Sequence, residues 1–429
     1  MKTYPFLFVF LFCLFSVTLD AQINIKGKVK DQTNNRANNK VDQSIDNGLD
    51  AVEGGVKDLF KKKKNEEEVE EEQKEEVEQT EEENNEVEVE KMVKPDIDKK
   101  PSLTSYSKFD FIPGEKIIFY DDFSQDAVGD FPALWFSNGS GEVVTFNNFP
   151  GKWLQLTAEG CYYPERDLQT SENFTVEFDY ICPTEVMDLG FYFVSGNIKD
   201  PEEGGAIPGK AGVKTSITNT LIYTSSYSDG DYVMDGNASV ELNTNEKIHF
   251  SYWVQKQRLR IYVNEKKVSD LPRIMPLGYK FNVLRFELGD GPKPCITNFR
   301  VAAGLPDTRN KLITEGKLVT YGIYFDVNSD KVKPESYGTL KDIAGILNEV
   351  PDVRVKIFGH TDADGQDATN LDLSKRRAAS VKNELANSFG VNADRLETDG
   401  LGETKPVAPN DTPVNKALNR RVEFIKLNK

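Results

Sequence analysis

The stretch that decides the fold of the C-terminal part of the chain is residues 353–362, which read VRVKIFGHTD. Val353, Val355 and Ile357 alternate with other residues, and this period of two predicts a strand. The polar turn 359–362 follows the strand directly. Asp362 is therefore expected to lie at the end of a strand.

Helix and strand patterns surround this strand. From Pro334 to Val350, apolar residues recur with helical spacing at 340, 343, 344 and 347, and a proline at 351 ends the pattern. A second helix is predicted over 373–389, with Gly390 at its end. Strands are predicted over 322–327 (GIYFDV) and 421–427 (RVEFIKL). Residues 316–429 are therefore expected to form an α+β domain of ordinary size.

Several separated motifs follow one another in this region. They are GHTD at 359–362, Asn370, LSKRRA at 373–378, LGETKPVAPN at 401–410 and NRRV at 419–422. Together they resemble the OmpA-like peptidoglycan-binding domain, which also occurs in peptidoglycan-associated lipoproteins and flagellar stator proteins. The resemblance extends from about Gly322 to Leu427. It implies non-covalent binding of peptidoglycan through the diaminopimelate of its stem peptides.

A receptor for diaminopimelate must hold an ammonium group and a nearby carboxylate. Asp362 is suited to accept the ammonium, and Arg377, which follows on a helix, is suited to take the carboxylate with two parallel hydrogen bonds. The resemblance implies that these two residues form the central pair. It implies supporting roles for Thr361, Asn370, Leu373, Arg420 and Asn328, with Arg420 as a second cation.

The alternative is a plain surface ion pair between Asp362 and Arg377. Such a pair contributes only about 0–1 kcal/mol in water. Charge-assisted bonds to a ligand contribute about 1.5–3 kcal/mol each when they are partly desolvated. Ligand binding therefore requires a concave, partly dry site.

Two other features of this domain are expected to be structural. His360 is predicted to pack beside the site rather than to act as a base. Residues 326–330 (DVNSD) begin like a calcium loop, but the glycine and the terminal glutamate of an EF-hand are missing. No metal and no other cofactor is predicted.

Residues 109–304 carry short apolar or alternating runs bounded by Gly, Pro, Asn or Asp. The runs are 116–120, 173–180, 190–194, 221–224, 248–254, 258–263, 282–288 and 296–302. Such runs predict an all-β domain. An outer-membrane barrel is the alternative, but its strands need about 10 residues each. Most runs here are shorter and several are apolar on both faces, so the sequence favours a jelly-roll sandwich.

This middle region resembles the concanavalin-like and laminin-G-like jelly rolls. The likeness is carried by DDF at 121–123, GDFP at 129–132 with Trp135, the hairpin RLRIYVNEKKV at 258–268 and the run 296–302. The resemblance implies carbohydrate binding, and cleavage in some members. Cleavage needs two carboxylates across a groove, and the spacing of Glu177, Asp179, Glu287 and Asp290 singles out no pair. The tryptophans at 135, 153 and 253 are predicted to be buried.

The N-terminal quarter of the chain is predicted to contain a targeting segment and a linker. Residues 1–21 hold one lysine followed by about a dozen apolar residues, which predicts a cleaved signal peptide and export, with a membrane anchor as the alternative. Residues 22–108 are predicted to be a disordered, highly charged linker. Within it, residues 65–90 contain 15 Glu and one Lys. This run is expected to be a solvated spacer, with an interaction tail as the alternative.

The composition of the 429 residues excludes some functions. The net charge of −17 and the pI of about 4.8 argue against nucleic-acid binding. Two histidines exclude most histidine-rich metal sites. Cys161, Cys182 and Cys295 leave two alternatives open, one bridge plus one thiol or three buried thiols.

Together the parts predict a non-catalytic, exported protein of a Gram-negative cell envelope, in the periplasm or associated with the outer membrane. Its C-terminal domain would bind peptidoglycan, and its sandwich would bind an unidentified glycan or envelope protein. Two other classes stay open: a secreted polysaccharide-active enzyme localised to the wall by the C-terminal domain, and a porin-like integral protein. The oligomeric state and the mode of membrane association are left open.

Overall fold

The structure is a computed structural model that describes residues 109–185, 188–197 and 207–427. These residues all belong to one compact unit, Asp98–Lys429. The predicted signal peptide (1–21) and charged linker (22–108) lie outside the described residues. No helix within the described ranges has the length and apolar content that a membrane span requires.

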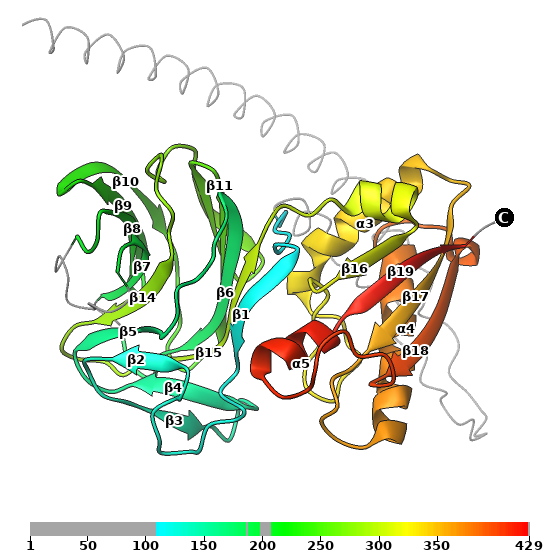
Figure 1. Cartoon of the computed structure of the whole chain (residues 1–429), viewed down its shortest axis with the longest axis horizontal. Coiled ribbons are helices and arrows are strands. Elements are labelled where there is room, and N and C mark those ends of the chain that lie inside the picture. Colours follow the sequence, from blue (N-terminus) through cyan, green and yellow to red (C-terminus); the bar gives the residue numbers. More distant parts are fainter. Residues whose placement is uncertain (1–108, 186–187, 198–206, 428–429) are drawn as a thin grey trace, which may run out of the picture. The chain divides into compact units, whose positions relative to one another are not determined.

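Eight strands of the middle region form one antiparallel sheet (Figure 1). Seven of them follow one another across the sheet in the order β13 (Lys266–Leu271), β12 (Arg258–Val263), β11 (Ile248–Gln255), β6 (Asn173–Ile181), β15 (Cys295–Ala303), β4 (Lys152–Leu156) and β3 (Gly141–Thr145). The eighth strand, β1 (Lys116–Asp121), pairs with the second half of β15. β15 is therefore shared between two partners on one side, because β4 pairs only with its first two residues.

A second antiparallel sheet of seven strands faces the first. Its order is β10 (Asp231–Ser239), β9 (Leu221–Ser228), β8 (Ala211–Ile217), β7 (Leu189–Ser195), β14 (Val283–Leu288), β5 (Gly160–Pro164) and β2 (Trp135–Ser137). Each of the eight runs predicted from the sequence falls on a strand of one sheet or the other. The expectation of an all-β middle region is confirmed.

Aromatic rings from both sheets fill the space between them. The ring of Phe178 on β6 lies 5.3 Å from that of Phe191 on β7 and 5.0 Å from that of Phe286 on β14. All three side chains are fully buried. Burial of each contributes about 1.5–3 kcal/mol relative to exposure, so these contacts hold the two sheets face to face.

The tryptophans and cysteines of this region are core residues. Trp135, Trp153 and Trp253 are between 1% and 8% exposed, which confirms the prediction that they are buried. The three cysteines are buried too, and no disulfide joins them within the described residues. This agrees with the alternative of three buried thiols.

A bulge interrupts β15 at the point where its partner changes. The register with β6 shifts between Thr297 and Arg300, and Asn298 adopts a φ of 52°. An extra residue in one strand turns a side chain out of its regular alternation. The bulge thereby aims Asn298 at polar groups on β1 and β6.

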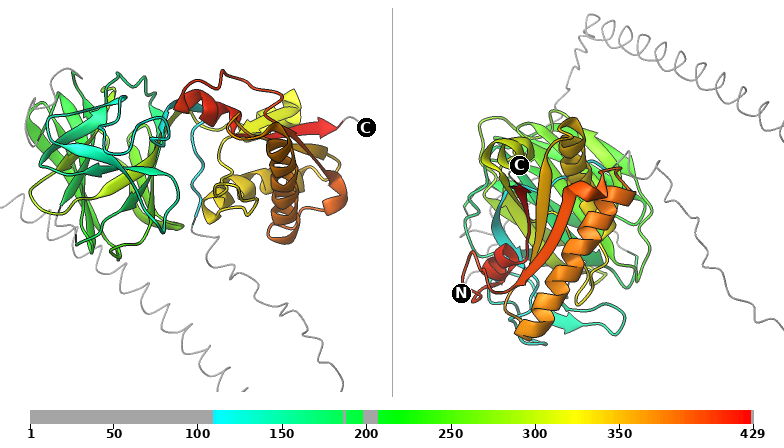
Figure 2. Two further views of the ribbon diagram at one scale, coloured as in Figure 1. Left: turned by 90° about the horizontal axis from the view of Figure 1, so that it is seen from below. Right: turned by 90° about the vertical axis from the view of Figure 1, so that its right-hand side faces the viewer.

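The C-terminal region is an α+β layer. Its sheet has the order β16 (Lys317–Thr320), β19 (Val422–Leu427), β17 (Arg354–His360) and β18 (Leu396–Gly402), with only β17 and β18 parallel. The helices are α3 (Tyr337–Glu349), α4 (Asp367–Asn387) and α5 (Pro413–Asn419), with single turns at Asn310–Glu315, Pro334–Ser336 and Ala393–Arg395. α4 runs along one face of the sheet (Figure 2).

The two predicted helices and two of the three predicted strands of this region are present, with shifted ends. α4 begins at Asp367, six residues before the predicted start, because residues 367–372 are helical but mostly exposed and carry no apolar stripe. Gly390 follows α4 with a φ of 70°, and the N–H of Val391 donates to the carbonyl of Leu385, which closes the helix end.

The predicted strand 322–327 is wrong. β16, which ends at Thr320, takes the sheet edge, and beyond it the chain folds back on itself. The N–H of Lys333 donates to the carbonyl of Tyr324, and Asn328 turns the chain with a φ of 56°. Phe325 makes only a single bridge, to Val332. The apolar residues of this segment thus pack without joining the sheet.

Candidate functional site

Six of the seven predicted site residues come from elements that meet at the C-terminal ends of β17 and β18. Thr361 and Asp362 follow β17, Arg420 follows α5, and three lie on α4: Asn370, Leu373 and Arg377. The seventh, Asn328, lies in the loop between β16 and α3. Positions 370, 373 and 377 share one face of the helix, because they are three and four residues apart.

Two glycines allow α4 to lie close to these strand ends. A Cβ atom on Gly359 of β17 would fall 2.2 Å from the backbone oxygen of Ser374, and one on Gly400 of β18 would fall 2.3 Å from the N–H of Lys375. The hydroxyl of Ser374 accepts a hydrogen bond from the N–H of Gly402 at 2.9 Å. The helix that carries Asn370 is therefore fixed against the sheet.

Asn370 organises the loop that carries the acidic residue. Its buried side-chain amide donates to the carbonyls of Asp362 (3.3 Å) and Asp364 (3.1 Å) and to Oε2 of Glu403 (2.6 Å). The N–H of Ala363 donates to Oδ1 of Asn410 at 3.1 Å. The backbone of residues 361–364 is thus held from two sides.

Asp362 is nearly buried and paired with Arg420. The distance between Oδ2 of Asp362 and Nη1 of Arg420 is 2.6 Å, and the Asp362 side chain is 12% exposed. Among the residues that the structure describes, Oδ1 accepts only a longer bond from the N–H of Asp364, at 3.2 Å. Burial disfavours the charge of Arg420, but Tyr120 and the Asp362 carboxylate outweigh it and raise the pKa of Arg420.

Arg377 is held by neutral groups. Nε donates to the carbonyl of Ser329 at 2.9 Å, Nη2 donates to that of Asp326 at 3.1 Å, and the guanidinium lies 4.8 Å from the ring centre of Phe325. Burial lowers the pKa of Arg377 to about 10, and the Asp362 carboxylate opposes part of that shift. Arg377 is therefore charged at neutral pH.

The remaining predicted residues differ in their exposure. Leu373 is 6% exposed and Thr361 is 5% exposed. Within the described residues, the Thr361 hydroxyl has no hydrogen-bond partner. Asn328 is exposed, in the loop whose carbonyls hold Arg377. The structure brings Asp362, Asn370 and Arg420 into direct contact, and it connects Arg377 to Asn328 through the 326–330 loop.

This arrangement can bind a group that carries both charges. Arg420 neutralises one oxygen of Asp362, which leaves acceptor capacity on the other for an ammonium. In the described part of the chain no carboxylate lies within 4 Å of Arg377, so its charge is available to a ligand carboxylate. The surface ion pair between Asp362 and Arg377, which was the alternative, does not form.

Two contributors to this site, Glu403 and Asn410, were not singled out from the sequence. They hold the acidic loop as described above. Lys416, whose position the family resemblance marks as a peripheral contact, lies 2.8 and 3.0 Å from the two carboxylate oxygens of Asp364. Glu403 and Asn410 belong to the motif LGETKPVAPN, which was recognised only as a whole. Their individual roles depend on side-chain directions that the motif does not encode.

His360 packs in a buried charged cluster next to the site. It is 4% exposed, and its Nε2 lies 3.7 Å from Oε1 of Glu423, which also accepts from Arg421 at 2.9 Å. Burial, reinforced by the charge of Arg421, lowers the pKa of His360 to about 4. This geometry agrees with the packing role predicted for His360.

Two of the candidate carboxylates of the middle region lie on β6 in a buried polar network. Nδ1 of His249 lies 2.7 Å from Oδ1 of Asp179, and its Nε2 lies 3.7 Å from Oε2 of Glu177. The hydroxyl of Tyr324 donates to Glu177 at 2.7 Å, and Arg300 donates to the same hydroxyl at 3.0 Å. Both carboxylates are at most 3% exposed, so they serve this network rather than face an open groove.

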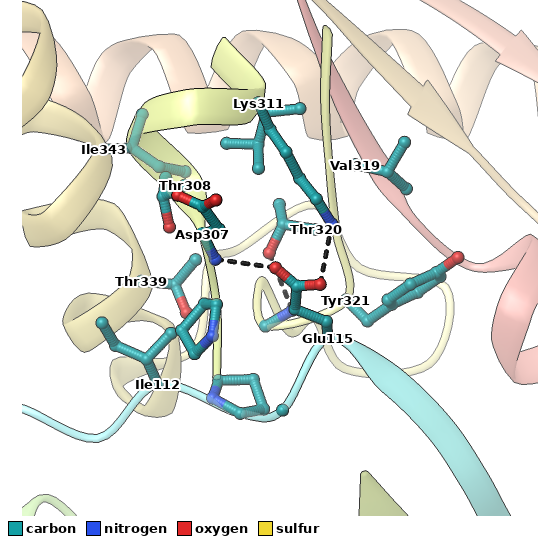
Figure 3. Close-up of a pocket in the computed structure, with 15 residues that line it drawn as sticks. Ile112, Glu115, Asp307, Thr308, Lys311, Val319, Thr320, Tyr321, Thr339 and Ile343 are labelled. Carbon is teal, nitrogen blue, oxygen red and sulfur yellow. Dashed lines mark hydrogen bonds and ion pairs between the residues drawn. The ribbon is translucent and has the colours of Figure 1, made fainter. Parts of the chain in front are cut away.

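A small cavity lies where the chain enters β1 and leaves the sandwich (Figure 3). Glu115 crosses it and accepts from the N–H of Asp307 at 2.7 Å and from Nζ of Lys311 at 2.9 Å. Its volume of about 30 Å³ is room for about one water molecule. This cavity therefore has a structural role.

The strand-end carboxylate of Asp362 and the helix-borne guanidinium of Arg377 thus belong to one α+β domain. Residues 324–420 are an OmpA family domain. The resemblance stated from the motifs is confirmed for this part of the chain.

The chain resembles two curated relatives over this region. It is 40% identical over 111 residues to outer membrane porin F of Pseudomonas aeruginosa, covering 26% of this chain and 32% of the porin. It is 40% identical over 103 residues to peptidoglycan-binding protein ArfA of Mycobacterium tuberculosis, covering 24% of this chain and 31% of that protein. The chain thus spans about a third of the length of each.

Among solved structures, the chain is similar to carbohydrate-binding module CBM66 from Bacillus subtilis. The identity is 15% and the TM-score is 0.29, over 39% of this chain and 95% of the module. A likeness at this level assigns no function.

Proposed function

We propose that the C-terminal domain binds peptidoglycan non-covalently, with the ammonium of diaminopimelate on Asp362 and its carboxylate on Arg377. The observation that carries the proposal is a nearly buried carboxylate and a guanidinium held by carbonyl groups, whose charges act on each other. A zwitterionic ligand would place its ammonium on the Asp362 carboxylate and its carboxylate on the Arg377 guanidinium at the same time. The Asn370 and Asn410 contacts hold the acidic loop in place before the ligand arrives.

Two further observations support this function. Thr361 presents a buried hydroxyl beside Asp362, and among the described residues it has no partner. A buried polar group without a hydrogen bond costs free energy that a ligand contact recovers. The relative from Mycobacterium tuberculosis, 40% identical over this region, is named a peptidoglycan-binding protein.

For the rest of the chain we propose a non-catalytic envelope protein, in the periplasm or associated with the outer membrane of a Gram-negative cell. Residues 1–21 would direct export, and residues 22–108 would act as a spacer. The sandwich, which we take to be a jelly roll, would bind a glycan or an envelope protein. The burial of Glu177 and Asp179 with His249 supports a non-catalytic role for these two carboxylates.

Co-sedimentation of the purified chain with diaminopimelate-type peptidoglycan sacculi tests the C-terminal assignment. Asp362→Ala and Arg377→Ala each remove one charge-assisted contact and are expected to weaken binding by about tenfold or more. Asp372→Ala and Lys382→Ala are matched controls, because each removes one charge from the same helix at a position that makes none of the site contacts described above.

The pattern across the four variants decides the outcome. Loss of binding in the first two, with wild-type binding in the controls, supports the site. A wild-type chain that stays in the supernatant contradicts the function. Equal losses in all four variants contradict the assignment of Asp362 and Arg377, because they point to the overall charge of the helix instead.

A further inference from the structure

We infer that the peptidoglycan site is completed by the sandwich: Asp122 and Tyr120, at the end of β1, position Arg420 and thereby keep Asp362 open to the ligand's ammonium. The inference rests on the proposed function of the C-terminal domain. It adds two positioning residues from a part of the chain that lies outside the OmpA family match at 324–420.

The Arg420 guanidinium makes contacts on two sides. On one side its Nη1 contacts Oδ2 of Asp362 at 2.6 Å. On the other side its Nη2 lies 3.8 Å from Oδ2 of Asp122, and its guanidinium lies 5.1 Å from the ring centre of Tyr120. α5, the helix that ends next to Arg420, contacts β1.

Contacts within the sandwich fix the positions of Tyr120 and Asp122. The hydroxyl of Tyr120 donates to Oδ1 of Asn298 at 2.9 Å and approaches Oδ2 of Asp122 at 3.4 Å. Asn298 sits in the β15 bulge and donates to Oδ2 of Asp179 at 2.9 Å. A continuous chain of polar contacts therefore runs from the buried network of β6 to Arg420.

A second contact from the sandwich reaches the segment around Asn410, which helps to hold the loop that carries Asp362. The side-chain amide of Gln125 donates to the carbonyl of Asp411 at 3.3 Å. Asp411 follows Asn410, whose side chain accepts from the N–H of Ala363. Residues 120–125 thus contact Arg420, which pairs with Asp362, and Asp411, the neighbour of Asn410.

The Arg420 guanidinium divides its contacts between the carboxylates of Asp362 and Asp122, and this division has a direct consequence for ligand binding. A guanidinium prefers to contact a carboxylate with two parallel hydrogen bonds. If Arg420 engaged both oxygens of Asp362, it would occupy the acceptor that a ligand ammonium needs. Asp122 and the Tyr120 ring keep one edge of the guanidinium on the sandwich side, so Asp362 retains one oxygen for the ligand.

Calorimetric titration of the full chain with a soluble diaminopimelate-containing disaccharide tetrapeptide tests this inference. Asp122→Ala and Tyr120→Leu are each expected to weaken binding about fivefold. Asp122→Glu, which keeps the carboxylate, is expected to retain most of the affinity. Asp270→Ala is the matched control, because Asp270 pairs with Arg258 at 2.6 Å on the same sandwich.

A double-mutant cycle separates positioning from general damage. If Asp122 acts through Arg420, Asp122→Ala is expected to have less than about a twofold effect in an Arg420→Ala background. Thermal unfolding of each variant reports whether the chain is folded. A fivefold loss that persists without Arg420 overturns the positioning role.

The two proposals fail in different ways. Wild-type affinity in a folded Asp122→Ala variant overturns this inference and leaves the peptidoglycan site standing, provided that Asp362→Ala abolishes binding. A wild-type chain that does not bind the tetrapeptide overturns both.

Discussion

Replacing His249 with Gln should destabilise the protein by an amount that depends on pH. The imidazole lies between Asp179 and Glu177, at 2.7 and 3.7 Å. Burial disfavours its charge, but the two carboxylates outweigh burial and raise the pKa of His249 from 6.5 to about 9. Burial also opposes the charge of Asp179, yet the bond to His249 holds the pKa of that carboxyl below its usual range. The cation and the anions therefore stabilise one another.

The size of the effect follows from the shift in the pKa of His249. A shift from 6.5 to about 9 corresponds to about 3 kcal/mol of stability. A raised pKa favours the folded state fully below pH 6.5, and the contribution fades as the pH rises through 9. We expect the variant to lose about 3 kcal/mol at pH 5.5, about 2 kcal/mol at pH 7.5 and less than about 1 kcal/mol at pH 9.5.

Other charged groups face the same pocket and must be considered in the assay. Lys247 lies 3.5 Å from Asp179, and Arg300 lies 4.0 Å from Glu177. Urea unfolding of wild type and His249→Gln at the three pH values measures the difference. A loss that is independent of pH, or one below about 1 kcal/mol at pH 5.5, would refute the reasoning.

Three further predictions concern the C-terminal domain. His360, whose pKa burial lowers to about 4, should stay neutral down to about pH 5, and stability should fall as the pH drops from 6.5 towards 4, because only the unfolded state takes up the proton in that range; an NMR titration distinguishes it readily, because the chain has two histidines. Gly359→Ala places a Cβ atom 2.2 Å from a backbone oxygen of α4 and should cost about 2 kcal/mol or more in urea unfolding. Arg395→Ala removes three hydrogen bonds to carbonyls of the α3–β17 turn, at 2.8 to 2.9 Å, and should cost about 2–3 kcal/mol, most of which Arg395→Lys should not recover.

Each of these has a contrary result that is easy to recognise. A histidine signal that titrates near 6.5 contradicts the burial of His360. Wild-type stability of Gly359→Ala means that α4 can move away from β17. Full recovery by Arg395→Lys means that charge, and not the geometry of the guanidinium, stabilises the turn.

Local patterns were sufficient for most elements. The alternation of Val353, Val355 and Ile357 predicted β17, and helical spacing predicted α3 and α4, because these periods reflect which side chains face the core. The prediction of a strand over residues 322–327 was wrong for the same reason. These residues are apolar and suited to a strand, but the sheet edge was already taken by β16, and only the pairing of distant strands decides that.

The sequence by itself predicted an all-β region followed by an α+β domain, and the order of its motifs singled out Asp362 and Arg377. Only the tertiary structure decided which cation pairs with Asp362. Arg420 does so, 58 residues away, while Arg377 binds loop carbonyls. The same holds for Tyr120 and Asp122, which reach Arg420 from another domain. Periodicity encodes which face of an element is buried, whereas a contact between side chains far apart in the chain depends on how whole elements pack.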